Sequence, residues 1–198
     1  MNKYIKNFLL LIILASLFGC STPKFSTKLH DKSYKNKISS LNALIIRGNF
    51  PKAKQYLTRS RVEEIQWYKE VGEKIKLNFN HNGLNLTYDV FSNLKNAKSA
   101  LNNRSTTIPT LVIHPYTVIV QSGTYNIALG FRATLFAPNR EKPIWSGITG
   151  IAPYRAADEL SLKILNELSQ LKLVTLNKKT AETIEGKKNS SFGGVLTK

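Results

Sequence analysis

Hydrophobic and polar residues follow two different periods along the middle of the chain. Over residues 61–79 apolar side chains recur every three or four positions, which predicts a helix with one buried face. A similar stripe over residues 157–171, with acids in its first turn, predicts a second helix. Between residues 125 and 135 apolar side chains occupy every second position, which predicts a half-buried strand.

Shorter segments complete the predicted order. Residues 41–46 are an apolar run and residues 84–90 alternate, so each is expected to form a strand. A short helix is expected over residues 92–103, and the strand predicted over residues 111–121 contains Pro115, which favours an edge strand or a bend. A further strand is expected over residues 144–151.

This order of elements predicts an α+β fold. Three consecutive strands with short links are typical of an antiparallel meander, and the two long helices can cover its apolar face. We therefore expect a two-layer sandwich with a mainly antiparallel sheet. Gly83, which follows the first long helix in the sequence Asn82-Gly83, is expected in the left-handed conformation past the helix end.

The first 19 residues have the pattern of a secretory signal. Lys3 and Lys6 precede an apolar run over residues 8–18, which at about 1.5 Å per residue covers only about half of a bilayer core. A permanent spanning helix is therefore the weaker interpretation. Positive residues before the run hold that end of the chain in the cytoplasm.

Leu17-Phe18-Gly19-Cys20 resembles the lipobox of bacterial lipoproteins. The resemblance implies cleavage before Cys20, acylation of its thiol and new amine, and a mature chain anchored in the membrane. Ser21 after the Cys implies, for a Gram-negative host, an outer-membrane protein facing the periplasm; in a Gram-positive host the cell membrane is expected. An uncleaved anchor and a buried, inert Cys remain the alternatives for the only Cys of the chain.

Composition divides the rest of the chain into three parts. Residues 20–40 carry scattered Lys, Ser and Thr without an apolar period, and we expect them to form a flexible basic tether behind the lipid. Residues 41–173 hold all the predicted elements and form the α+β domain. Residues 174–198 are expected to be a flexible tail.

The chain of 198 residues is strongly basic, with 29 Lys and Arg against 12 Asp and Glu and a formal charge of +17. Nucleic acid would be the obvious partner of so basic a chain, but an exported protein does not meet nucleic acid in its compartment. A cytosolic nucleic-acid binder is the alternative if the N-terminal segment is not a secretory signal. Between Asp89 and Asp158 the only acid is Glu141. The candidate binding residues come from this stretch: Arg132, Arg140, Lys142, Arg155 and Trp145, the last of which is more often a core residue.

No reactive motif accompanies these bases. The three His have no metal-ligand spacing, no serine-nucleophile elbow is present, and an acylated Cys20 cannot be a nucleophile, so we expect no catalytic residue, metal or cofactor. The expected function is a non-catalytic accessory or binding module for an envelope protein complex or an anionic lipid or glycan. The alternative is an envelope hydrolase whose site would gather Asp89, His114 and Tyr116.

The layout also resembles a group of small envelope lipoproteins. The segments that carry the resemblance are the lipobox, Asn82-Gly83-Leu84 after the first helix, Pro143-Ile144-Trp145-Ser146-Gly147, and the closing helix over residues 156–173. Proteins of this kind include auxiliary lipoproteins of ABC transport systems and uncharacterised outer-membrane lipoproteins. The resemblance implies an α+β domain and an envelope location, and it assigns no functional residue.

Overall fold

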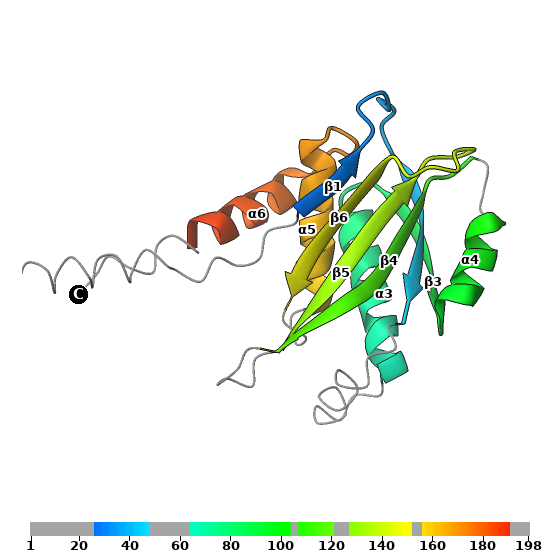
Figure 1. Cartoon of the computed structure of the whole chain (residues 1–198). Helices are drawn as coiled ribbons and strands as arrows, with labels where there is room; N and C mark the ends of the chain where they lie inside the picture. The colour runs from blue at the N-terminus through cyan, green and yellow to red at the C-terminus, as the bar shows by residue number, and fades with distance from the viewer. Residues whose placement is uncertain (1–25, 48–63, 104–106, 121–126, 152–155, 191–198) are drawn as a thin grey trace, which may run out of the picture.

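The computed structural model describes residues 26–47, 64–103, 107–120, 127–151 and 156–190 (Figure 1). Cys20, Arg155 and the predicted signal lie outside these ranges. The elements in chain order are β1 (Ser26–His30), β2 (Ser40–Ile46), α3 (Glu64–His81), β3 (Asn85–Phe91), α4 (Leu94–Asn102), β4 (Thr110–Val120), β5 (Ile127–Phe136), β6 (Trp145–Ile151), α5 (Ala156–Gln170) and α6 (Lys178–Ser190).

Six strands form one sheet in the order β1-β6-β5-β4-β2-β3. β4, β5 and β6 make the predicted antiparallel meander, and β1 extends it by pairing antiparallel to β6. β2 is inserted between β3 and β4 and is parallel to both. The sheet is therefore mainly antiparallel, with a parallel portion at the β3 edge.

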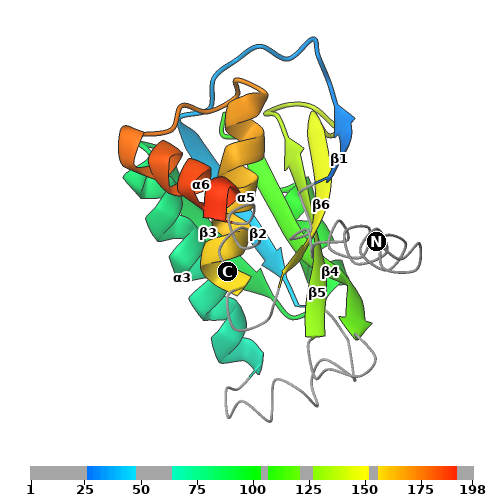
Figure 2. The ribbon, with the colours of Figure 1, turned by 90° about the vertical axis from the view of Figure 1, so that its left-hand side faces the viewer.

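Helices α3 and α5 cover one face of the sheet, which confirms the predicted two-layer α+β sandwich (Figure 2). The core between the layers includes fully buried Phe79 and Ile75 of α3, Phe131 of β5 and Ile164 of α5. These residues come from the two apolar stripes and the alternating strand that the sequence showed. Burial of their side chains holds the two layers together.

Helix α4 lies on the other side of the sheet, next to β2 and β3. Asn93 caps it by accepting a hydrogen bond from the backbone N–H of Asn96 at 2.9 Å. Ala97 is buried against Leu44 and Val112, whereas Leu94 is 54% exposed. Because α4 is short, it covers this face only near the β3 edge of the sheet.

Pro115 lies in a central strand, not at an edge. β4 has β5 on one side and β2 on the other, and the ladder to β5 is shifted between Pro115 and Thr117. A bulge at this point lets the strand accommodate a residue that has no N–H to donate. Of the two alternatives predicted for Pro115, the bend is confirmed and the edge strand was wrong.

The N-terminal segment is more ordered than the predicted tether. Ser26–His30 form β1, and the buried Ile38 donates its N–H to the carbonyl of Leu173 at 2.8 Å. β1 offers little sequence signal because Leu29 is its only large apolar residue. The described part of residues 20–40 therefore belongs to the folded domain.

The described part of the predicted C-terminal tail is also structured. Val174 is 4% exposed, and Lys178–Ser190 form α6, which projects from the domain (Figure 1). Asn177 caps α6 at the N–H of Thr180, at 2.8 Å, and also donates to the carbonyl of His81. Oδ1 of Asn82 also accepts a hydrogen bond from the backbone N–H of Asn177 at 3.0 Å. The start of α6 is thus fixed to the end of α3.

Candidate basic cleft at the end of the sheet

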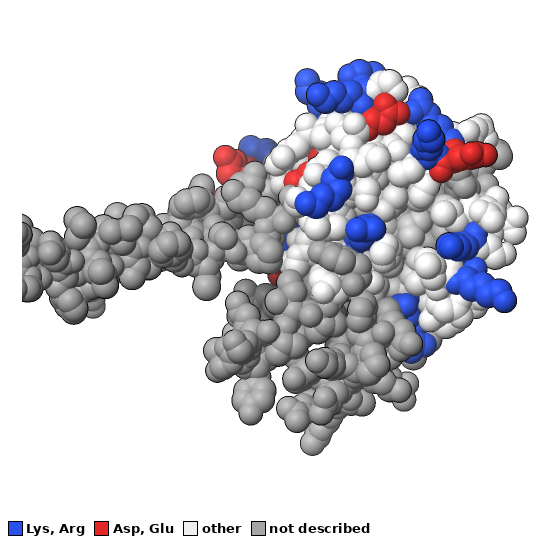
Figure 3. All heavy atoms as spheres, viewed as in Figure 1, with Lys and Arg blue, Asp and Glu red and all other residues white. Residues whose placement is uncertain are grey.

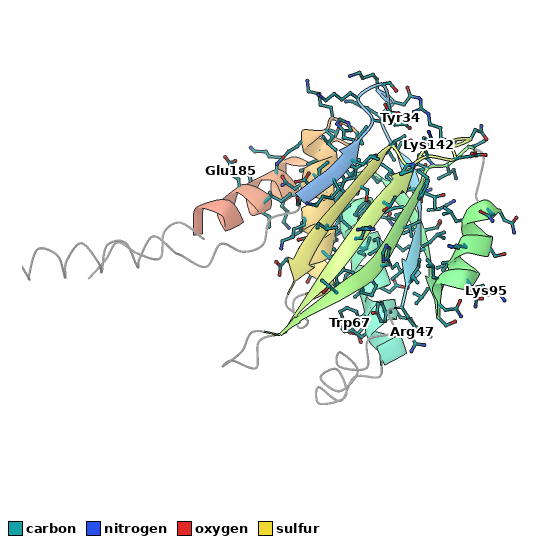
Figure 4. The ribbon with its side chains drawn as sticks, viewed as in Figure 1. Tyr34, Arg47, Trp67, Lys95, Lys142 and Glu185 are labelled. Atoms are coloured by element: carbon teal, nitrogen blue, oxygen red, sulfur yellow. The ribbon has the colours of Figure 1, made fainter. Side chains whose placement is uncertain are left out.

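A cleft of about 480 Å³ lies at the end of the sheet where three connections meet. The connections run from β1 to β2, from α4 to β4 and from β5 to β6. Figure 4 shows Tyr34 and Lys142 at this end, with Arg47 and Trp67 at the other. The side chains and backbone that line the cleft belong to Tyr34, Asn36, Lys37, Ile38, Ser39, Ser40, Thr107, Ile108, Pro109, Ala137, Pro138 and Arg140.

Arg140 is held in the wall of this cleft by two contacts. Its Nη1 donates to Oδ2 of Asp31 at 2.5 Å, and its guanidinium lies 5.6 Å from the centre of the Tyr34 ring. The first is a charge-assisted hydrogen bond and the second is within cation–π range. Since the Arg140 side chain is 44% exposed, these contacts orient a cation that solvent can still reach.

Asp31 is itself fixed by a local turn. Its Oδ1 accepts hydrogen bonds from the N–H of Ser33 at 2.9 Å and from Oγ of Ser33 at 2.6 Å. These bonds, more than the contact with Arg140, hold the pKa of Asp31 below its usual value. The carboxylate is therefore a charged acceptor that positions Arg140.

Two further features define the chemistry of the cleft. Lys37 lines it and donates from Nζ to Oγ1 of Thr175 at 3.3 Å. Burial raises the pKa of Tyr34, an effect that the Arg140 charge opposes, so the phenol is neutral at physiological pH. Two cations, a neutral phenol and backbone groups suit a phosphate or carboxylate group.

The other predicted binding residues are not all at this site. Lys142 is exposed on the β5–β6 connection near the cleft. Arg132 is exposed in the middle of β5, where its ladder partners are His114 of β4 and Ile148 of β6. Arg155 lies outside the described residues. The structure thus brings Lys142 close to Arg140 and places Arg132 on a separate part of the sheet.

Trp145 does not belong to the binding surface. It is 0% exposed within the core, and its Nε1 donates to Oγ1 of Thr27 at 3.2 Å. In β6 it alternates with the half-buried Ser146, so its ring points toward the helical layer. Its role is packing, which corrects its place among the candidate binding residues.

The residues of the alternative hydrolase site are spread over the sheet. Asp89 of β3 is level with Leu44 of β2 and Val112 of β4, so β2 separates it from His114, which is two positions further along β4. Tyr116 has no described side chain. Burial lowers the pKa of His114, with the Arg132 charge acting in the same direction and the Pro115 carbonyl opposing it. The described positions of Asp89 and His114 therefore do not form one cleft.

Within the described ranges, no group of three or more His, Cys, Asp or Glu is arranged to hold a metal ion. No helix of the same residues is long and apolar enough to span a membrane.

Sequence reasoning missed Tyr34 and Lys37, which line the cleft, and Asp31, which positions Arg140. All three lie in the segment predicted to be a tether. The sequence did contain one signal, because Asp31 followed by Ser33 is a spacing at which a carboxylate caps a turn. The closure of the cleft by residues 107–109 and 137–140 depends on tertiary structure and has no local signal.

No protein-family model matches the sequence, and no curated protein matches it. Among solved structures, the fold is similar to the PelC dodecamer from Paraburkholderia phytofirmans, at 9% identity over 78% of this chain and 100% of that chain, with a TM-score of 0.40. A putative neuraminyllactose-binding hemagglutinin homolog from Helicobacter pylori is 12% identical over 77% of this chain and 93% of that one, with a TM-score of 0.28. A lipoprotein from Neisseria meningitidis is 13% identical over 67% and 96%, with a TM-score of 0.30. These values assign no family to the chain.

Proposed function

We propose that the protein is a lipid-anchored envelope lipoprotein whose α+β domain is a non-catalytic binding module for an anionic partner. The partner is an envelope protein complex or an anionic envelope polymer. The single observation that carries this proposal is the cleft in which Arg140 and Lys37 line one opening at the end of the sheet.

The contacts of Arg140 support a binding role, because they orient its guanidinium before a partner binds. Asp31 and Tyr34 hold the guanidinium from two sides, and Ser33 holds Asp31. An arginine that is already oriented loses less side-chain entropy when it binds a carboxylate or phosphate. A solvated arginine on a flexible loop would lack this advantage.

Anchoring is supported by the lipobox-like sequence that ends at Cys20, shortly before the folded domain begins at Ser26. Acyl chains at Cys20 would keep the domain at the membrane without a spanning helix. The cleft would then be presented to partners in the same envelope compartment. In this role the protein needs no reaction of its own.

Photo-crosslinking in cells tests the binding role. A photoreactive residue in place of Asn36, which lines the cleft, is expected to give a discrete crosslinked product, whereas the same residue at Lys76, exposed on α3, gives none. Arg140→Glu should abolish the Asn36 product, because it reverses the charge that the partner contacts. Recovery of no protein or glycan product from the Asn36 position would contradict the proposal.

A further inference from the structure

The helices among the described residues leave one face of the sheet uncovered over most of four strands. Helices α3 and α5 lie behind β1, β6, β5 and β4 in Figure 1, and on the near side α4 packs on β2 and β3 and reaches Val112 at the start of β4. We call the near face of β1, β6, β5 and β4 the open face. Its middle row is Ser26, Ile148, Arg132 and His114, which are successive partners across the ladders.

The strands that form the open face carry positive charge and no acid. The sequences of β1, β4, β5 and β6 contain two bases, Lys28 and Arg132, and no Asp or Glu. Both bases are exposed, and Leu29 on β1 is 41% exposed. Figure 3 shows basic atoms over β1 and the middle of this face, with acidic atoms only toward its edges where side chains are described.

Two of the connections at the end of the sheet, β1 to β2 and β5 to β6, add further positive charge. Residues 31–39 and 137–144 add Lys32, Lys35, Lys37, Arg140 and Lys142 against Asp31 and Glu141. Together with the four strands, this part of the molecule has a formal charge of +5, from seven bases and two acids. Within it, Lys37 contacts Thr175 after α5, whereas Arg132 lies on the face away from α3 and α5.

The three helices on the other side carry no net formal charge, because α6 contributes +2 and α3 and α5 contribute the opposite charge. The sequences of α3 and α5 give a formal charge of −2, from Lys69, Lys74, Lys76 and Lys163 against Glu64, Glu70, Glu73, Asp158, Glu159 and Glu167. One of these acids lies beside β1, since Oε2 of Glu167 accepts a hydrogen bond from Thr27 at 2.8 Å. The two sides of the edge strand therefore differ in charge.

The anchor point is close to this boundary. Six peptide units join Cys20 to Ser26, and a fully extended chain spans at most about 3.6 Å per residue, so Cys20 is within about 22 Å of the start of β1. Neighbouring strands are about 4.8 Å apart, so the open face from β1 to β4 is about 15 Å wide. A membrane that holds Cys20 can thus reach either side of β1, and the charge of each side decides which one it contacts.

We propose that the open face rests on the anionic headgroups of the membrane in which Cys20 is anchored. This orientation depends on the lipidation in the proposed function. Lys28 and Arg132 contact headgroup phosphates, Leu29 contacts the interface, and helices α3 and α5, whose net charge is negative, face the aqueous compartment. The cleft, at the end of the strands, then lies beside the membrane surface and remains open to a partner.

Vesicle binding by the full mature chain with Cys20→Ala tests the contact without the lipid anchor. Binding is expected on vesicles that mix phosphatidylcholine with phosphatidylglycerol, and it should weaken as salt is raised. Lys28→Gln with Arg132→Gln should lower the binding constant about 30-fold, which corresponds to about 1 kcal/mol for each of two bases. The matched control, Lys69→Gln with Lys74→Gln on α3, should change it less than about twofold.

Labelling of the lipidated chain tests the orientation directly. A polarity-sensitive dye attached to the Leu29→Cys variant should report a less polar environment on anionic vesicles, while the same dye attached to the Lys76→Cys variant should not change. Equal effects of the two double variants, or protection of position 76 and not of position 29, would overturn the proposal. If Cys20 is acylated in cells but the vesicle and dye experiments give these opposite results, the proposed orientation is wrong and the proposed lipid anchor is unaffected.

Discussion

Arg132 of β5 lies directly opposite His114 of β4, and both side chains are on the open face of the sheet. His114 is half-buried there, and burial, followed by the like charge of Arg132, outweighs the Pro115 carbonyl and lowers its pKa below the usual 6.5. The folded protein therefore resists protonation of this ring more than the unfolded chain does.

This relationship predicts a loss of stability in mild acid. Below pH 6.5 the unfolded chain binds a proton at His114 that the folded state does not, so the free energy of unfolding falls as the pH is lowered. His114→Gln should remove this part of the pH dependence, and Arg132→Gln should reduce it only slightly because burial is the larger cause. Urea unfolding at pH values of about 7.5 and about 5 measures the effect; an unchanged slope in His114→Gln would contradict it.

Gly72 of α3 gives a second prediction, since a Cβ at this position would lie 2.3 Å from Cε2 of Tyr88. The Tyr88 ring is also held by a hydrogen bond from its hydroxyl to Oε1 of Glu73 at 2.7 Å. Gly72→Ala should displace the ring and destabilise the protein by about 1 kcal/mol, the balance of overpacking against the better helix propensity of Ala.

The sign should reverse when the ring is removed. In a Tyr88→Ser background, Gly72→Ala meets no ring and should stabilise the protein by up to about 1 kcal/mol through helix propensity. Thermal and urea unfolding of the four proteins in this cycle measure the coupling. The same effect of Gly72→Ala in both backgrounds would show that the Tyr88 ring does not limit this position.

The turn at Asp31 predicts which contact controls its ionisation. Because the bonds from Ser33 are the largest causes of the lowered pKa, Ser33→Ala should raise the pKa of the Asp31 carboxyl more than Arg140→Gln does. The folded-state pKa is below the unfolded value, so this contribution to stability is present above the unfolded pKa and is lost as pH falls through the folded one. Carbon-detected NMR titration of Asp31 in the two variants decides the order.

The joint between α3 and α6 predicts a local effect. Asn177→Ala removes the cap of α6 and the bond to the His81 carbonyl, and should cost about 0.5–2 kcal/mol. Hydrogen exchange should accelerate in the first turns of α6 and stay unchanged in β5. A matched removal of an exposed amide, Asn102→Ala at the end of α4, should leave the α6 amides unaffected.

Long periodic segments made the main architecture predictable. The two helical stripes and the alternation over residues 125–135 each identify a buried face, and consecutive antiparallel strands pair with their neighbours in sequence. Gly83 has φ of 75°, as its place after α3 predicted. These features depend on local sequence, and the structure agrees with them.

The missed features depend on partners far away in the chain. β1 has few apolar residues and is defined by pairing with β6, and Tyr34 packs on the core only because the strand before it is fixed. The cleft joins segments from three parts of the sequence, so its bases could be suspected from the scarcity of acids between Asp89 and Asp158, but their grouping could not. Arg132, on the polar face of the alternating strand, was the leading candidate in the sequence, and the fold separates it from Arg140.

Acylation of Cys20 underlies both the proposed function and the proposed orientation of the domain. Metabolic labelling of cells with radioactive palmitate, comparing the natural chain with Cys20→Ala, tests it directly. We expect label in the natural chain, none in the variant, and loss of the variant from the membrane fraction after a salt wash. A natural chain that stays unlabelled while it is made at normal levels would contradict the account.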